Sequence, residues 1–267
     1  MDKIGIDAGG SLIKIVYSER EKLHYKKYSI NEKEKLSQWL QFIAPSVKVN
    51  ITGGISVLLK ENYIKNATIV DEFTSMATGS RYLLQIEENH VQGDYILISI
   101  GTGTSIYHIM QSSFERLLGT GIGGGTFIGL GYLLTGENNF YSLVEKAEEG
   151  NRVNSDLLVQ DIYGHENTPL IGELTASNFG KAHLNNKGTN HDYLASTIQM
   201  IAETCFLLAS QAAISKQIDK LMFVGSTLEG NRLLKQKLIQ FGQTANFKVI
   251  IPTVGAYCGA LGAYVHD

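Results

Sequence analysis

Isoleucines alternate with other residues near the start of the chain. In IGIDAGGSLIKIVYS, residues 4–18, they recur at every second position on either side of a Gly-Gly turn at residues 8–11. A period of two is typical of half-buried strands. This stretch therefore predicts two strands joined by a tight glycine turn.

A later stretch repeats the pattern. DYILISIGTGTSIYHIM, residues 94–110, is again an apolar run, a turn of glycine and hydroxyl residues, and a second apolar run. Such an internal repeat indicates that the chain has two similar halves. Because the chain has only 3 prolines and no low-complexity linker, we expect the halves to meet in a tight crossover near Gly93, with domains at 1–93 and 94–267.

The rest of the pattern alternates between strands and helices. Residues 193–215 carry apolar side chains at three- and four-residue spacing, which predicts a helix packed against a core. A Gly-Ser turn at 225–226 separates a predicted strand from a predicted helix. The other predicted elements are a strand in LHYKKYSI, a helix around residues 32–43, a strand in VKVNITGG, a helix from near Thr74, a helix after the glycines of residues 119–131, and a closing helix in VGAYCGALGAYV.

Composition and charge narrow the class of protein. The 267 residues are 43% hydrophobic, enough for a core, and the net charge of −3 comes without a basic stripe, so we expect no nucleic-acid partner. The N-terminus lacks the basic-then-apolar order of a signal peptide, and Glu203 interrupts the most apolar stretch, so we expect no membrane contact. Cys205 and Cys258 lie far apart, without histidines at zinc-ligand spacing, which fits a reducing cytoplasm.

The glycine turns at the strand ends indicate a phosphate ligand. Their backbone N–H groups and hydroxyls are suited to gripping a polyphosphate, and Asp7, at the end of the first strand, is placed to hold a hydrated metal ion. An ordinary hairpin with a Gly-Gly turn explains the first stretch equally well. The P-loop pattern does not occur, and the G-x-G-x-x-G match at residues 119–124 is too isolated to indicate a dinucleotide fold.

Three motifs together resemble those of the actin-like ATPase superfamily, which includes the sugar kinases. DAGGS at residues 7–11 with Lys14, GTGTS at 101–105 and FVGS at 223–226 look like its phosphate-1, phosphate-2 and adenosine motifs. Over nearly its full length the chain most resembles the bacterial type II pantothenate kinases, although Ser11 replaces the usual Thr and Tyr257 the usual Phe. The features that carry the closer resemblance are Glu72 in IVDEF, RLLGTGIGGGTFIGLG at 116–131, ELTASNFG at 173–180 and the closing GAYCGALGA.

The resemblance implies a fold, a reaction and a set of site residues. The fold is α/β, with two similar actin-like (ribonuclease H-like) domains and a nucleotide cleft between them. The reaction is phosphoryl transfer from ATP, with Mg²⁺, to pantothenate, the first step of coenzyme A synthesis, in a cytoplasmic homodimer. The implied ATP-binding residues are Asp7, Gly9, Gly10, Ser11, Lys14, Thr104, Gly121, Gly123, Gly124, Gly125, Thr126, Gly225 and Ser226, with Asp7 also holding Mg²⁺ through water.

The resemblance also implies a catalytic base. Glu72 is the carboxylate expected to accept the alcohol proton, while Asp71 points away from it and caps the following helix. Lys14 either approaches the β- and γ-phosphates or only ends a strand. The residues implied to contact the acceptor are Arg116, Thr102 and Gly101.

Two other functions stay open. A sugar or amino-sugar kinase would keep the fold and change the acceptor, but N-acetylhexosamine kinases of this superfamily often carry a cysteine zinc cluster that this sequence lacks. A nucleotide-binding switch or ATPase would need no carboxylate to deprotonate an alcohol, although Glu72 could position water instead. For the expected homodimer, the 193–215 helix is either an interface or a core helix, and the ELTASNFG loop is expected to reach toward the acceptor site of the neighbouring subunit.

Overall fold

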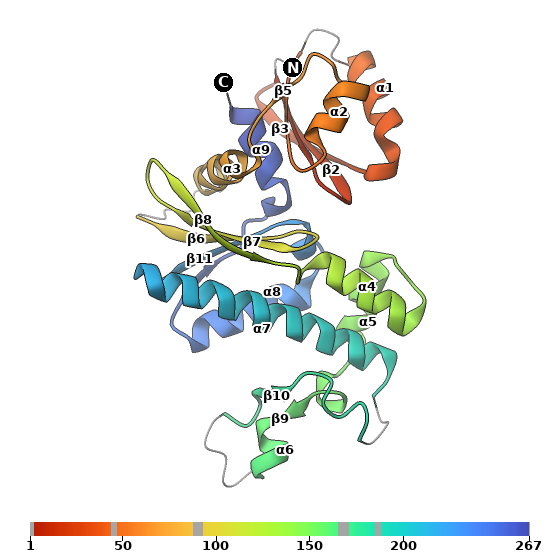
Figure 1. Ribbon diagram of the computed structural model, residues 1–267, viewed down its shortest axis with the longest axis vertical. Coiled ribbons are helices and arrows are strands. Elements are labelled where there is room, and N and C mark those ends of the chain that lie inside the picture. The colour runs from red at the N-terminus through yellow and green to blue at the C-terminus, as the bar shows by residue number, and fades with distance from the viewer. Residues whose placement is uncertain (1–2, 44–46, 88–92, 165–170, 185–187, 267) are drawn as a thin grey trace.

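Two five-stranded sheets follow one another along the long axis of the molecule (Figure 1). The structure is a computed structural model that describes residues 3–43, 47–87, 93–164, 171–184 and 188–266. The first sheet, in the order β3-β2-β1-β4-β5, contains β1 (Lys3–Ala8), β2 (Leu12–Glu19), β3 (Lys22–Ser29), β4 (Lys48–Thr52) and β5 (Thr68–Ile69). The second, in the order β12-β11-β6-β7-β8, contains β6 (Tyr95–Ile100), β7 (Thr104–Ile109), β8 (Phe114–Thr120), β11 (Lys220–Val224) and β12 (Lys248–Ile250).

The two sheets share one topology. In the first sheet β1, β2 and β3 pair in antiparallel fashion, and β1, β4 and β5 pair in parallel. In the second sheet β6, β7 and β8 pair in antiparallel fashion, and β6, β11 and β12 pair in parallel. The repeat predicted from the two glycine hairpins is therefore confirmed, and each hairpin begins its own sheet.

Helices cover both faces of each sheet. The first sheet packs on α1 (Lys33–Ile43) and α2 (Ser56–Asn62) through one core cluster, and α3 (Glu72–Ile86) and α9 (Cys258–Val265) lie between the two sheets. The outer face of the second sheet packs on α4 (Gly124–Thr135), α5 (Phe140–Glu149), α7 (Asn190–Lys216) and α8 (Arg232–Thr244). Alternate residues of β6 face the two sides of the second sheet. Ile96 and Ile98 belong to the core cluster that includes α7, whereas Tyr95 and Leu97 belong to the one that includes α3 and α9.

Helix α9 packs against β1 and α3 although it lies at the end of the chain. Glycines make this approach possible, since a Cβ on Gly5, Gly79 or Gly262 would lie 1.8–2.2 Å from a backbone oxygen of the facing element. The predicted boundary near Gly93 stays a prediction. The closing helix, numbered within the second predicted domain, nevertheless packs on the first sheet.

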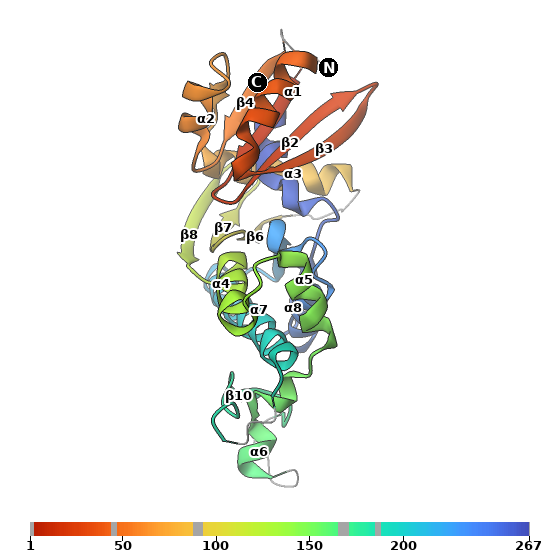
Figure 2. The ribbon, with the colours of Figure 1, turned by 90° about the vertical axis from the view of Figure 1, so that its right-hand side faces the viewer.

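Helix α7 is the helix predicted for residues 193–215. It begins with a capping box in which the Thr189 hydroxyl accepts from the backbone N–H of Asp192. By length and hydropathy it could cross a membrane, but 61% of its most apolar window is buried inside the protein, as in a core helix. Beyond its N-terminal end, a small protrusion holds β9 (Leu157–Leu158), α6 (Val159–Tyr163) and β10 (Thr175–Ser177) (Figure 2).

Candidate active site

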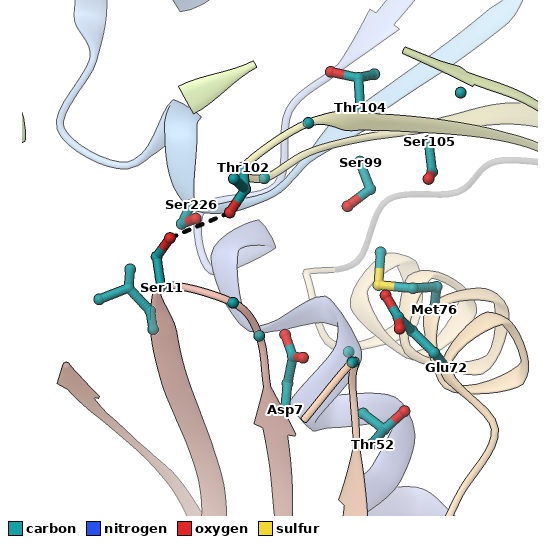
Figure 3. Close-up of a pocket in the computed structure, with 18 of the residues that line it drawn as sticks. Asp7, Ser11, Thr52, Glu72, Met76, Ser99, Thr102, Thr104, Ser105 and Ser226 are labelled. Atoms are coloured by element: carbon teal, nitrogen blue, oxygen red, sulfur yellow. Dashed lines mark hydrogen bonds between the residues drawn. The ribbon is translucent and has the colours of Figure 1, made fainter. Parts of the chain in front are cut away.

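A cavity of about 550 Å³ lies where the two hairpin turns meet (Figure 3). It is lined by the β1–β2 turn, the β6–β7 turn, strand β8 and the first turns of helix α3. Residues from both sheets therefore face one space. The predicted site residues that line it are Asp7, Gly9, Gly10, Ser11, Lys14, Glu72, Gly101, Thr102, Thr104, Arg116, Gly121 and Ser226.

The tips of the two turns touch. Ser11 Oγ and Thr102 Oγ1 lie 3.3 Å apart, and either hydroxyl can donate to the other (Figure 3). In front of the first turn the space is open, since a Cβ on Gly10 would meet no atom of the described residues within 4 Å. Glycine backbone and hydroxyl groups that face an open space are suited to binding phosphate.

The second turn is braced from behind by the glycine segment after β8. Backbone N–H groups of Gly124 and Gly125 donate to the carbonyls of Gly101 and Thr102 at 2.8 and 2.9 Å. The two segments approach so closely that a Cβ on Gly123 would lie 2.8 Å from the Thr102 oxygen. These glycines thus fix the shape of the turn that faces the cavity.

A smaller cavity of about 190 Å³ continues from the first. The two cavities share Ser11, Thr102 and Ser226, and the smaller one is also lined by Gly124 and Gly125. Its apolar walls are Ile128, Phe140 and Tyr141.

Three predicted ATP-binding residues, Gly123, Thr126 and Gly225, line neither of these two cavities and instead shape the backbone around them. The Thr126 hydroxyl donates to the Gly121 carbonyl at 2.9 Å. Gly225 has φ of 111°, and a Cβ there would lie 2.3 Å from the Ile100 oxygen.

Lys27 connects the two halves at the rim of the smaller cavity. Its Nζ donates to Glu229 Oε2 at 2.9 Å and to the Tyr141 hydroxyl. Although burial alone would lower the pKa of Lys27, these hydrogen bonds and the Glu229 charge raise it above its usual value. Lys27 therefore stays charged and holds β3 against the second half.

Asp7 and Lys14 form an ion pair at the cavity wall. They are direct partners in the β1–β2 ladder, and Lys14 Nζ donates to Asp7 Oδ2 at 3.0 Å. Gly53 and Gly259 enclose the carboxylate, since a Cβ on either would lie 2.8–3.0 Å from its side-chain atoms. Lys14 therefore neutralises Asp7 and does more than end a strand.

The single carboxylate of Asp7 fits a magnesium ion whose other ligands are water and the phosphate oxygens of a bound nucleotide. Within the described residues, no three His, Cys, Asp or Glu side chains cluster as a metal site. Mg²⁺ commonly uses one or two carboxylates and completes its shell with water and substrate phosphates. A single carboxylate beside a turn suited to binding phosphate matches that requirement.

Glu72 begins helix α3 and faces the cavity together with Met76, one turn later (Figure 3). Desolvation by the surrounding protein raises the pKa of Glu72, and the charges of Asp7 and Asp71 raise it further against the opposing effect of Lys14 and Arg116. A carboxylate with a raised pKa is a better proton acceptor. The cavity thus places a carboxylate with a raised pKa on the side opposite the glycine turn that carries Ser11.

Asp71 has the structural role predicted for it. Its Oδ1 accepts from the backbone N–H and the hydroxyl of Thr74, both at 2.8 Å, as the N-cap of helix α3. The helix begins at Glu72, two residues before the predicted start. The cap therefore sets the direction in which Glu72 leaves the helix.

Several lining residues were not predicted from the sequence. Ser99 and Tyr107 lie on β6 and β7 and carry no special signal, whereas Ser105 ends the GTGTS motif but was not assigned a role of its own. Thr52 lies at the end of β4, just before the Gly-Gly pair of VKVNITGG, and that pair was a usable signal. Gly259 comes from the closing Gly/Ala-rich helix, whose position in the fold the local pattern does not reveal.

Solved structures with this fold bind adenine nucleotides. The activator of the 2-hydroxyisocaproyl-CoA dehydratase from Clostridium difficile, with bound ADPNP, has a TM-score of 0.63 at 16% identity and covers 99% of this chain and 93% of its own. A ROK family glucokinase from Streptomyces griseus, with glucose and AMPPNP, has a TM-score of 0.57 at 13% identity and covers 98% and 97%. Two repeated sheets around one cavity thus define an actin-like α/β protein, as predicted.

Sequence relatives narrow this class to one family. The Fumble family model matches residues 46–266. A type II pantothenate kinase of Oceanobacillus iheyensis is 41% identical over 263 residues, 98% of each chain, and one of Bacillus thuringiensis is 38% identical over 267 residues, 98% of this chain and 96% of that one. The chain belongs to the Fumble family of type II pantothenate kinases, and the resemblance seen in its motifs is confirmed.

Proposed function

We propose that this protein transfers the γ-phosphoryl group of ATP to the 4′-hydroxyl of pantothenate. The observation that carries the proposal is the position of Glu72, which shares one cavity with both phosphate-type turns. Relatives at 36–41% identity over nearly the whole chain are named type II pantothenate kinases. The likeness to a glucokinase structure supports the fold only and leaves the acceptor to the sequence relatives.

The residues of the cavity divide the work of phosphoryl transfer. The β1–β2 and β6–β7 turns bind the phosphates with backbone N–H groups and the hydroxyl of Ser11. Ser226 lies where the main cavity joins the apolar cavity that accepts the adenine. Lys14 lies against the phosphates beside Asp7. Asp7 would hold Mg²⁺ through water, and that ion would supply charge neutralisation on the phosphate oxygens.

The acceptor side of the cavity carries the base and a cation. Glu72 accepts the proton of the pantothenate hydroxyl as its oxygen bonds to the γ-phosphorus and ADP leaves. Arg116, Gly101 and Thr102 bind the acceptor. The planar guanidinium of Arg116 is suited to binding two neighbouring oxygen atoms at once. Tyr107 stays protonated, because burial raises its pKa.

We further propose a cytoplasmic homodimer. Two features support the dimer: exposed Leu207 and Ile214 lie two turns apart on α7, and the ELTASNFG loop is firmly held although β10 lies far from strands β2 and β7 of its own chain (Figure 1). Glu203 accepts from Asn178 at 3.2 Å, and buried Asp156 accepts from the backbone N–H of Phe179, whose φ is 59°. We propose that this loop reaches the neighbouring subunit's acceptor site. A fully active monomer in sedimentation would contradict this.

An acceptor panel tests the proposed reaction. ADP release from Mg-ATP is measured with pantothenate, glucose or N-acetylglucosamine, and the product is identified by mass. We expect release only with pantothenate, with one phosphoryl group added to it. Release with a hexose would instead indicate a sugar kinase, and release without any acceptor an ATPase or switch.

A further inference from the structure

Arg116 lines the cavity, and its guanidinium lies close to two residues that are not among the predicted site residues, Phe73 and Gly119. We propose that Phe73 and Gly119 are positioning residues that hold Arg116 toward the acceptor. The inference rests on the proposed role of Arg116 in acceptor binding. Phe73 follows Glu72 in IVDEF and Gly119 lies in the glycine-rich segment 116–131, but the sequence assigned neither residue a role of its own.

The aromatic ring of Phe73 lies against the guanidinium. Arg116 Cζ is 5.3 Å from the centroid of the ring, within the range of a cation–π interaction. Phe73 itself is outside the set of residues that line the cavity, and its side chain is 39% exposed. The ring therefore acts on the site through Arg116 and not by touching a ligand.

The ring of Phe73 is fixed from behind. It packs on Tyr107 with the ring centroids 6.0 Å apart and the planes tilted by 55°, and Tyr107 is almost completely buried. Phe73 also follows Glu72 directly on the first turn of helix α3. The proposed base and the surface that holds the guanidinium thus belong to one rigid helix end.

Gly119 provides space for the guanidinium on the strand itself. A Cβ built on Gly119 would lie 2.6 Å from Arg116 Nη2 and 3.1 Å from the Thr104 carbonyl oxygen. The arginine tip is flexible, so a methyl group here would move the guanidinium before it moved the backbone. A methyl group at this position would therefore displace the guanidinium, while the Thr104 carbonyl would need to shift by only a few tenths of an ångström.

A β-bulge turns Arg116 toward the cavity. The β7–β8 register pairs Ile106 with Leu118 but Tyr107 with Arg116, so Leu117 is the extra residue. Directly paired residues of an antiparallel ladder share a face, and Tyr107 faces the cavity. In a regular ladder Leu117 would take the cavity-facing position and Arg116 the opposite face. The bulge, the ring and the glycine act on the same side chain.

A double-mutant cycle tests the proposal. Phe73→Leu keeps an apolar side chain and removes the ring, whereas Phe73→Tyr keeps the ring. We expect Phe73→Leu to lower kcat/KM for pantothenate by about 2- to 30-fold with the KM for ATP unchanged. Phe73→Tyr should keep kcat/KM within about twofold of the parent value. In an Arg116→Met background, Phe73→Leu should have no further effect.

Gly119→Ala gives a second, independent readout. It should lower kcat/KM for pantothenate with the KM for ATP and the melting temperature near the parent values. Gly129→Ala is the matched control, because a Cβ there meets no atom of the described residues within 4 Å.

An equal effect of Phe73→Leu with and without Arg116, or parent-like kinetics for Phe73→Leu, would overturn the proposal. Turnover of pantothenate by the parent enzyme in the same assay tests the proposed function separately. If the parent uses another acceptor, the same cycle is measured with that acceptor.

Discussion

Replacing Glu72 by Gln removes the proposed base and preserves its shape. Gln fills the same volume and still forms hydrogen bonds, but it cannot accept a proton. Loss of a general base typically costs a factor of about 10² to 10⁴ in rate, equivalent to about 3 to 5 kcal/mol of activation free energy. The KM for ATP should change little, because Glu72 lies across the cavity from Ser11 and the phosphate turn (Figure 3).

The structure indicates where in this range the loss should fall. Desolvation and the neighbouring carboxylates raise the pKa of Glu72, which makes it a stronger base. The fall in kcat on replacing it should therefore be larger. In a loose phosphoryl-transfer transition state the alcohol is only partly deprotonated, which makes the fall in kcat smaller. We therefore expect kcat to fall by about 10³, near the middle of the range.

The same pKa shift predicts a pH dependence and a stability effect. Glu72 must be ionised to accept a proton, so kcat of the parent should fall as the pH drops through a pKa above the ordinary carboxylate value, and Glu72→Gln should lack this limb. A carboxyl with a raised folded-state pKa stabilises the fold at low pH, and this contribution is lost as the pH rises through that pKa. At neutral pH, Glu72→Gln should thus melt no lower than the parent.

The assay is steady-state ADP release with saturating pantothenate over a range of pH, together with thermal melting. Asp71→Asn is the matched control, since Asn caps a helix about as well as Asp, and it should retain most of the parent activity. If Asp71→Asn is inactive while Glu72→Gln turns over pantothenate near the parent rate, the base has been assigned to the wrong carboxylate.

Three further changes probe the turn, the helix crossing and the bridge between the halves. Gly10→Val should abolish ATP binding in calorimetry at an unchanged melting temperature, because its side chain enters the open space in front of the turn; normal binding would contradict this. Gly262→Ala should destabilise the fold by about 1 to 3 kcal/mol in denaturant unfolding, since its Cβ would lie 1.8 Å from a backbone oxygen of α3; an unchanged stability would show that the crossing relaxes. Lys27→Met should weaken ATP binding by up to about fivefold, and an unchanged affinity would show that the bridge is incidental.

Elements with an undisturbed period could be predicted from the sequence. The first hairpin alternates, the second is built of two apolar runs, and both have glycine turns, so their strands and their repetition follow from local sequence. Strand β8 was not predicted, because the bulge at Leu117 breaks its alternation just before a glycine-rich segment. Helix α2 and strands β9 and β10 were not predicted either, since α2 has 7 residues and the strands 2 and 3, too few for a period to show.

The site was predictable as far as its residues sit in turns. Asp7 directly precedes a glycine turn, Ser11 and Thr102 lie in glycine turns, and Glu72 lies just before the predicted helix start, so each has a local signal. Tyr107 and Gly259 reach the cavity through strand pairing and helix packing between segments far apart in the chain. No local pattern contains that information.

The position of α9 has a consequence for synthesis of the protein on the ribosome. Residues 258–265 emerge long after β1 and α3, yet they fill the space beside these elements. At about 5–20 residues per second, the chain between the end of α3 and the start of α9 takes on the order of 10 to 30 s to make. During that interval the apolar face that α9 will cover is exposed on the nascent chain. We expect the first sheet to acquire its final stability only after α9 has emerged from the ribosome.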